Sequence, residues 1–172
     1  MKSLMFRLAV LSWLCVMPGL ARAGAGPRPT ASIIPPPATG PTLSVMTLAG
    51  HRFDLKAQHG KWVIVNFWAT WCGPCIHEMP ALSAFAASRT NVAVIGLAYE
   101  DQPVSKIRAF LGKHPVRYPV ARIDPLHPPK GIAMPSVLPT TFLIAPDGRL
   151  VRKFVGPLDL HRLEAAIGAA GT

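Results

Sequence analysis

Two almost uninterrupted apolar runs constrain the fold of this chain more strongly than any other feature. They are WVIVNFW (62–68) and VAVIGLA (92–98), and neither alternates with polar residues as a half-exposed strand would. Such runs are typical of strands that are buried on both faces of a sheet. The segment between them, 73–88, has its apolar residues at helical spacing: Met79, Leu82, Phe85 and Ala86. We therefore expect a helix between two central strands.

Two hairpins are predicted on either side of this centre. SVMTL (44–48) and HRFDL (51–55) flank Ala49-Gly50, which indicates a small N-terminal hairpin. TTFLIAPDGRLVRKFV (140–155) has the pattern of two strands joined by a tight Asp147-Gly148 turn.

Two further helices complete the pattern. Asp101 and Pro103 mark the start of one, whose apolar face holds Val104, Ile107 and Leu111. Asp159 is expected to cap the other, whose inward residues are Leu160, Leu163 and Ile167. The proline-rich segment 114–138 predicts little regular structure beyond a short strand near 118–121. This order of elements predicts an α/β fold with a mixed sheet and helices on both faces.

The first residues have the pattern of an export signal. Lys2 and Arg7 provide a positive start, 8–20 is apolar, and Ala21–Ala23 supplies the small-x-small motif of a cleavage site. Spanning a bilayer takes about 20 apolar residues, so an uncleaved membrane anchor is the weaker alternative. Cys15 has no small residues just before it, so we do not expect lipid attachment there.

The chain is therefore divided into a signal peptide (1–23), a tether (24–43) and one folded domain (44–172). The tether holds six prolines and one charge, and it cannot bury a core. Cleavage would leave Cys72 and Cys75 as the two cysteines, and would lower the formal charge from +10 to +7, with 15 basic against 8 acidic residues. Export would place both thiols in an oxidising compartment, where a disulfide persists unless it is reduced.

The positive charge does not indicate a nucleic-acid partner. The arginines are scattered singly, and no stripe of arginine with stacking aromatics is present. A solvated basic surface is the simpler interpretation, and we expect no nucleic acid to bind.

Cys72 and Cys75 lie where a buried strand ends and a helix begins. Backbone N–H groups at a helix start lack partners, and the helix dipole favours negative charge there. Thiol pKa values in such motifs fall from about 8.5 to about 3.5–7.5. The outer sulfur of Cys72 would attack a partner's disulfide, and Cys75 would resolve the mixed disulfide.

Other uses of the cysteine pair fit less well. Covalent haem attachment requires histidine directly after the second cysteine, where this chain has Ile76. A structural zinc site usually needs four protein ligands, and His77 is expected to be an ordinary surface residue. A purely architectural disulfide across so short a loop would remove little chain entropy. Electron transfer is the remaining interpretation.

NFWATWCGPC (66–75) and LPTTFLIAPDGRLVRKFVG (138–156) resemble the thioredoxin superfamily. Among its branches, the chain looks most like the exported TlpA/ResA-type thiol-disulfide oxidoreductases. The resemblance covers about 43–168. It implies a thioredoxin fold with a central mixed sheet, preceded by a short N-terminal hairpin, and no cofactor or metal.

The resemblance assigns roles to individual residues. Pro139 matches the family's cis-proline, which leaves backbone groups of Leu138 free to pair with a bound peptide. Glu78 matches the acid that follows the second cysteine by three residues. At this spacing it shares a helix face with Cys75, so its carboxylate would accept the proton of that thiol. Pro80 matches a proline that kinks the helix.

One position departs from cytosolic thioredoxin. Asn66 stands where that branch has a buried aspartate, so proton handling would fall to Glu78. The alternative is that Glu78 is a solvated acid at the start of the helix. Trp71, Gly73 and Pro74 are expected to form part of the docking surface for protein substrates.

These features predict an exported protein-disulfide reductase in the periplasm or cell envelope. The Gly-Pro pair between the cysteines is the one found in reducing thioredoxins. Its substrates would be oxidised envelope proteins in cytochrome c maturation or copper-site assembly, and its electrons would come from a membrane donor of the DsbD/CcdA type. We expect a monomer, and residues 124–138 should lie near Pro139 and shape partner choice.

Two alternatives remain open. A disulfide oxidase or isomerase would use the same cysteines at a different reduction potential. A non-enzymatic copper chaperone would use Cys72, Cys75 and a distant histidine, with His114, His127 and His161 as candidates. A peroxide-reducing enzyme is weaker, because the pattern around a single peroxidatic cysteine is missing.

Overall fold

The structure is a computed structural model that describes residues 40–170. The predicted signal peptide and the tether up to residue 39 lie outside the described residues. Packing begins just before the first strand, because Leu43 is buried and the N–H of Thr42 donates to the carbonyl of Gly131 at 2.8 Å. No helix in residues 40–170 is long and apolar enough to cross a membrane.

A five-stranded sheet forms the centre of the domain, in the order β5-β4-β3-β6-β7. Its strands are β3 (Trp62–Trp68), β4 (Val92–Tyr99), β5 (Val120–Ile123), β6 (Thr140–Ile144) and β7 (Leu150–Val155). β3, β4 and β5 run parallel, while β6 and β7 run antiparallel to their neighbours. β3 is the middle strand, and all seven of its residues are buried, as its continuous apolar pattern predicted.

Helices connect the strands. α1 (Gly73–Ala87) links β3 to β4, α2 (Val104–Lys113) links β4 to β5, and α3 (Leu160–Ala170) follows β7. The N–H of His161 donates to the Asp159 carboxylate at 2.9 Å, which confirms the predicted cap of the last helix.

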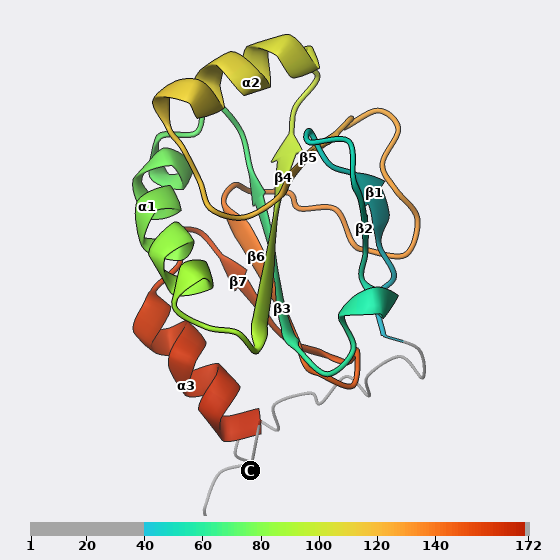
Figure 1. Ribbon diagram of the computed structural model, residues 1–172, viewed down its shortest axis with the longest axis vertical. Coiled ribbons are helices and arrows are strands. Elements are labelled where there is room, and N and C mark those ends of the chain that lie inside the picture. Colours follow the sequence, from blue (N-terminus) through green and yellow to red (C-terminus); the bar gives the residue numbers. More distant parts are fainter. Residues whose placement is uncertain (1–39, 171–172) are drawn as a thin grey trace, which may run out of the picture. The chain divides into compact units, whose positions relative to one another are not determined.

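One face of the sheet is covered by α1 and α3, with α3 below α1 at the left of Figure 1. The core on this side includes α1 residues Met79, Leu82 and Phe85 and α3 residues Leu163 and Ala166. Buried Ile107 of α2 joins the same cluster.

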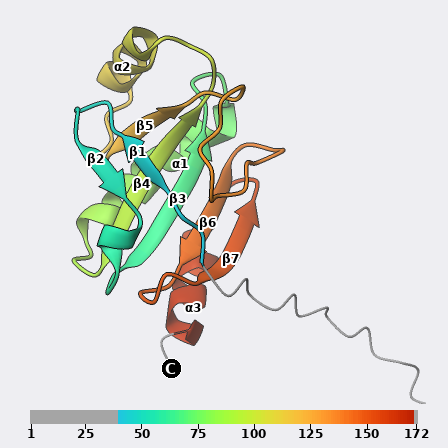
Figure 2. The same cartoon turned by 90° about the vertical axis from the view of Figure 1, so that its right-hand side faces the viewer.

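The other face is covered by the hairpin of β1 (Ser44–Met46) and β2 (Arg52–Asp54) and by the loop before β6 (Figures 1 and 2). A short 3-10 helix, η1 (Lys56–Gln58), follows the hairpin. Phe53 and Leu55 from the hairpin and Ile132 from the loop pack against sheet residues. On this face of the sheet, the only helix in residues 40–170 is the 3-10 turn η1. The hairpin and the loop supply the apolar cover instead.

The predicted thioredoxin fold, its mixed sheet and the preceding hairpin are confirmed by this arrangement. The expected short strand near 118–121 lies slightly later, as β5, because the register with β4 begins at Val120, opposite Gly96. The Asp147-Gly148 turn joins β6 to β7, with Gly148 at φ 86°, in the left-handed region that suits glycine.

Candidate active site

Cys72 and Cys75 form a disulfide at the N-terminus of α1, with an S–S distance of 2.03 Å. β3 ends at Trp68, and a three-residue loop brings the chain to Cys72. Cys72 is the N-cap of α1 and has extended backbone angles, φ −88° and ψ 98°. The strand-to-helix position predicted for the pair is therefore observed.

A backbone N–H of the first turn of α1 binds the Cys72 sulfur. The Cys72 Sγ accepts a hydrogen bond from the N–H of Cys75 at 3.3 Å. Free N–H groups and the positive end of the helix dipole stabilise a thiolate at this point once the disulfide is opened. Cys72 is 5% exposed and Cys75 is 0% exposed, so Cys72 is the sulfur nearer to solvent.

Glu78 lies one turn further along α1 and is buried. Its Oε1 accepts from the side-chain amide of Asn66 at 2.8 Å, and its Oε2 accepts from the N–H of Leu158 at 2.7 Å. Burial raises the pKa of Glu78 above its usual 4.5, against the opposing effect of these two hydrogen bonds. The interpretation as a solvated helix-start acid does not fit this buried position.

Asn66 is also buried, on β3 directly opposite Thr141 of β6. Its amide nitrogen donates to both Glu78 Oε1 and the hydroxyl of Thr141, the latter at 3.0 Å. Asn66 was predicted from the sequence only as a group that cannot titrate, and its hydrogen bond to Glu78 was not predicted. A polar residue inside the apolar run 62–68 was the available signal.

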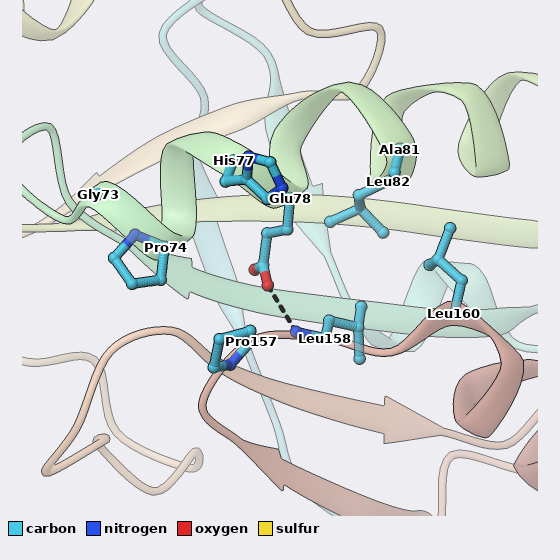
Figure 3. Close-up of a pocket in the computed structure, with 9 residues that line it drawn as sticks. All are labelled: Gly73, Pro74, His77, Glu78, Ala81, Leu82, Pro157, Leu158 and Leu160. Atoms are coloured by element: carbon cyan, nitrogen blue, oxygen red, sulfur yellow. Dashed lines mark hydrogen bonds between the residues drawn. The ribbon is translucent and has the colours of Figure 1, made fainter.

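A cavity of about 420 Å³ lies beside Glu78, between the first turns of α1 and the segment 157–160. Figure 3 shows Gly73, Pro74 and His77 on the helix side, and the Glu78–Leu158 hydrogen bond, which runs from the helix to the opposite segment. His77 is exposed, as predicted for a surface residue.

The Leu138–Pro139 peptide bond is cis, as the family resemblance implies. In residues 40–170, neither the N–H nor the carbonyl of Leu138 has a hydrogen-bond partner. Trp71, next to Cys72, is largely exposed. Pro80 lies inside α1.

A second buried carboxylate anchors the loop before the disulfide. Glu100, at the end of β4, accepts from the N–H of Thr70 at 3.1 Å and from its hydroxyl at 2.7 Å. Neither Thr70 nor Glu100 was predicted from the sequence to take part in the site. The sequence feature that could have indicated Glu100 is an acidic residue directly after a buried parallel strand. Binding and active sites of α/β proteins lie at this edge of the sheet.

The candidate copper-ligand histidines lie in separate places. His114 stacks on Phe110 with ring centroids 4.4 Å apart, and His127 lies 3.4 Å from the carboxylate of Asp124. His161 is in the first turn of α3. In the described part of the chain, no three metal-binding side chains come together.

The redoxin family profile matches residues 35–167, which include the whole sheet and the disulfide. The chain belongs to the redoxin family. This redoxin is 34% identical over 126 residues to the thiol-disulfide oxidoreductase ResA of a Bacillus cereus strain, covering 72% of each chain. It is 32% identical to the thioredoxin-like protein YneN of Bacillus subtilis, covering 72% of this chain and 74% of that one.

A solved structure agrees with these relatives. The crystal structure of a thiol:disulfide interchange protein of the thioredoxin family from Chlorobium tepidum TLS matches with a TM-score of 0.63 and 26% identity, covering 78% of this redoxin and 96% of that chain. These similarities and the Cys72–Cys75 disulfide support a thiol-disulfide oxidoreductase, which is a redox enzyme.

Proposed function

We propose that this protein is an exported protein-disulfide reductase of the cell envelope. The observation that carries the proposal is the placement of a CxxC disulfide at the start of α1 with a buried carboxylate one turn away. Export rests on the signal pattern of residues 1–23. The redox chemistry is shared with the ResA relatives.

The reaction would begin with the reduced pair. The Cys72 thiolate attacks one sulfur of a substrate disulfide, and the other substrate sulfur leaves and takes up a proton. The Cys75 thiolate then attacks the Cys72 sulfur, re-forms the protein disulfide and releases the second substrate thiol. Two electrons pass from the protein to the substrate, and the two substrate sulfurs take up two protons, which balance the proton lost by Cys72 when it ionises and the proton lost by Cys75.

Glu78 would accept the proton of Cys75 in the second step. A buried thiol ionises poorly, and a carboxyl one helical turn away whose pKa is raised by burial holds a proton more tightly than an exposed carboxyl would, so it is a suitable acceptor. The hydrogen bonds from Asn66 and Leu158 hold the carboxylate in place for this transfer. Glu78→Gln should slow exchange by about 100-fold, while Glu164→Gln, on the exposed face of α3, serves as the control.

The direction of electron flow would be toward the substrate. The CGPC pairing of Gly73 and Pro74 supports a reducing potential, nearer thioredoxin at about −270 mV than DsbA at about −120 mV. In an oxidising compartment, a membrane donor of the DsbD/CcdA type would restore the dithiol. Substrates would be oxidised apo-cytochrome c or copper-site assembly proteins.

Equilibration of the purified protein with glutathione tests the direction. We expect a potential near the thioredoxin value. A potential near the DsbA value would instead identify an oxidase or isomerase.

Trapping tests the roles of the two cysteines and reveals the substrate. Cys75→Ser should accumulate mixed disulfides between Cys72 and envelope proteins, identified by mass spectrometry. The matched variant Cys72→Ser should accumulate none, because it lacks the attacking sulfur. Equal trapping by both variants would refute the assigned order of attack. Fusion of residues 1–43 to a reporter that is active only outside the cytoplasm tests export.

A further inference from the structure

A second groove, of about 390 Å³, lies between Trp71 and the loop before β6. Its lining includes Leu138, whose backbone N–H and carbonyl are unpaired in the described residues. Unpaired backbone at such a position can bind an extended chain as an added strand. The groove therefore includes Trp71, which precedes Cys72 in the chain, and the unpaired backbone of Leu138.

Exposed apolar side chains form the rim of this groove. Trp71 is 70% exposed, Leu126 is 80% exposed and Val137 is 51% exposed. These are three of the seven large apolar side chains that are exposed in residues 40–170. A cluster of this kind next to a reactive sulfur indicates a binding surface.

The charges in the groove are opposite to those of the chain as a whole. The full chain carries 18 basic and 8 acidic residues, but the charged residues that line the groove are Glu100 and Asp101. Glu100 is buried and both its oxygens bind Thr70. The carboxylate of exposed Asp101 has no hydrogen-bond or ion-pair partner in the described residues.

Arg122 binds the backbone beside Asp101 but forms no ion pair with the Asp101 carboxylate. The guanidinium of Arg122 donates to the backbone carbonyls of Gln102 at 2.8 Å and Asp101 at 3.1 Å. It also lies 3.6 Å from the carboxylate of Asp124, which offsets its charge. The groove thus presents a free negative charge beside an apolar rim.

We propose that Asp101 selects among the substrates that dock in this groove, favouring an extended segment that places a lysine or arginine against its carboxylate. This inference rests on the proposed protein-disulfide reductase function and defines its substrate class. A basic segment is favoured by charge complementarity with Asp101, while acidic segments are repelled.

The test uses synthetic peptides oxidised to symmetrical disulfides. Each peptide has one cysteine and one leucine. A lysine or a glutamate is placed in turn at each of the two positions on either side of the cysteine. Reduced full-length protein is mixed with each disulfide, and the second-order rate of peptide thiol release is measured. The protein dithiol is oxidised, and each peptide disulfide gives two thiols.

At one or more positions, the lysine peptide should react about three-fold faster than its glutamate counterpart, the scale of a partly exposed ion pair. Asp101→Asn should remove this lysine-to-glutamate ratio. Asp147→Asn makes the same change of charge in the turn between β6 and β7, and it should preserve the lysine-to-glutamate ratio. The ratio should shrink in about 0.5 M salt because screening shortens the reach of surface charges.

Two kinetic results would overturn the proposal: equal rates for lysine and glutamate at every position, or an unchanged ratio in Asp101→Asn. The neutral disulfide of 2-mercaptoethanol separates this failure from failure of the proposed function. If wild type reduces that compound but shows no charge preference, the groove assignment alone is wrong. If wild type reduces neither that compound nor the peptide disulfides, the reductase function is wrong as well.

A second copy of the chain is the competing occupant of the groove. Sedimentation across protein concentration distinguishes the two cases. Dimerisation that Leu126→Ser abolishes would overturn the substrate assignment, whereas a monomer at all concentrations would leave the groove open for substrate.

Discussion

The side-chain amide of Asn66, in the middle strand, donates a 2.8 Å hydrogen bond to the carboxylate of Glu78 on α1. This bond joins the sheet to the helix that carries the disulfide. A neutral amide at this point leaves Glu78 as the single carboxyl of the pair, and its pKa is raised chiefly by burial.

Asn66→Asp should destabilise the protein by about 3 kcal/mol at pH 7, because it removes the donor and places two carboxyls together. One of them must then hold a proton, so the loss should shrink as the pH falls toward about 4.5. Urea denaturation at the two pH values measures this effect. Asn91→Asp, at an exposed position before β4, is the matched control and should change stability by less than about 0.5 kcal/mol. Equal losses in both variants would refute the coupling.

Glu78 should make stability depend on pH. Its folded pKa is raised above 4.5, so the folded state holds the proton more tightly than the unfolded chain. The stability that this group contributes is present below pH 4.5 and is lost as the pH rises through the folded pKa. The difference in unfolding free energy between wild type and Glu78→Gln should therefore shift in favour of glutamine as the pH rises. A shift in the opposite direction would contradict the raised pKa, and Glu164→Gln should not reproduce the trend.

Thr70→Val should loosen the loop that precedes Cys72. It removes the hydroxyl that donates to Glu100 at 2.7 Å and leaves a buried carboxylate oxygen unpaired, at a cost of about 2 kcal/mol. Amide hydrogen exchange at residue 70 should accelerate beyond the global change. Thr70→Ser keeps the hydroxyl and should retain most of the wild-type protection. If serine and valine behaved alike, the hydroxyl would not be the anchor.

Two glycines should respond to alanine in opposite directions. A Cβ at Gly96 on β4 would lie 2.9 Å from the ring of Tyr118 and 3.1 Å from the indole nitrogen of Trp68. Both rings are buried, so Gly96→Ala should cost about 1–3 kcal/mol through overpacking. Gly112 lies in α2 with open space around its Cβ position, and Gly112→Ala should stabilise by about 0.5–1 kcal/mol. Thermal denaturation shows whether each variant is less stable or more stable than wild type.

Local patterns were sufficient to predict most of the elements. The apolar run 62–68 became the buried strand β3, and the helical spacing after Cys72 became α1. The Asp147-Gly148 turn and the Asp159 cap were also predictable, because each depends on residues only a few positions apart. The position of the cysteines between a strand and a helix followed from the same local signals.

The amino-acid sequence by itself thus determined the secondary structure and the place of the two sulfurs. The tertiary structure decided how the buried carboxylates are bound: Glu78 receives its bonds from residues 12 and 80 positions away, and Glu100 binds a residue 30 positions away. It also decided that a hairpin and a loop cover the second face of the sheet, and that the groove beside Trp71 is lined by acidic residues. These features depend on strand register and on which side chains are removed from water together, and periodicity within one segment carries no information about either.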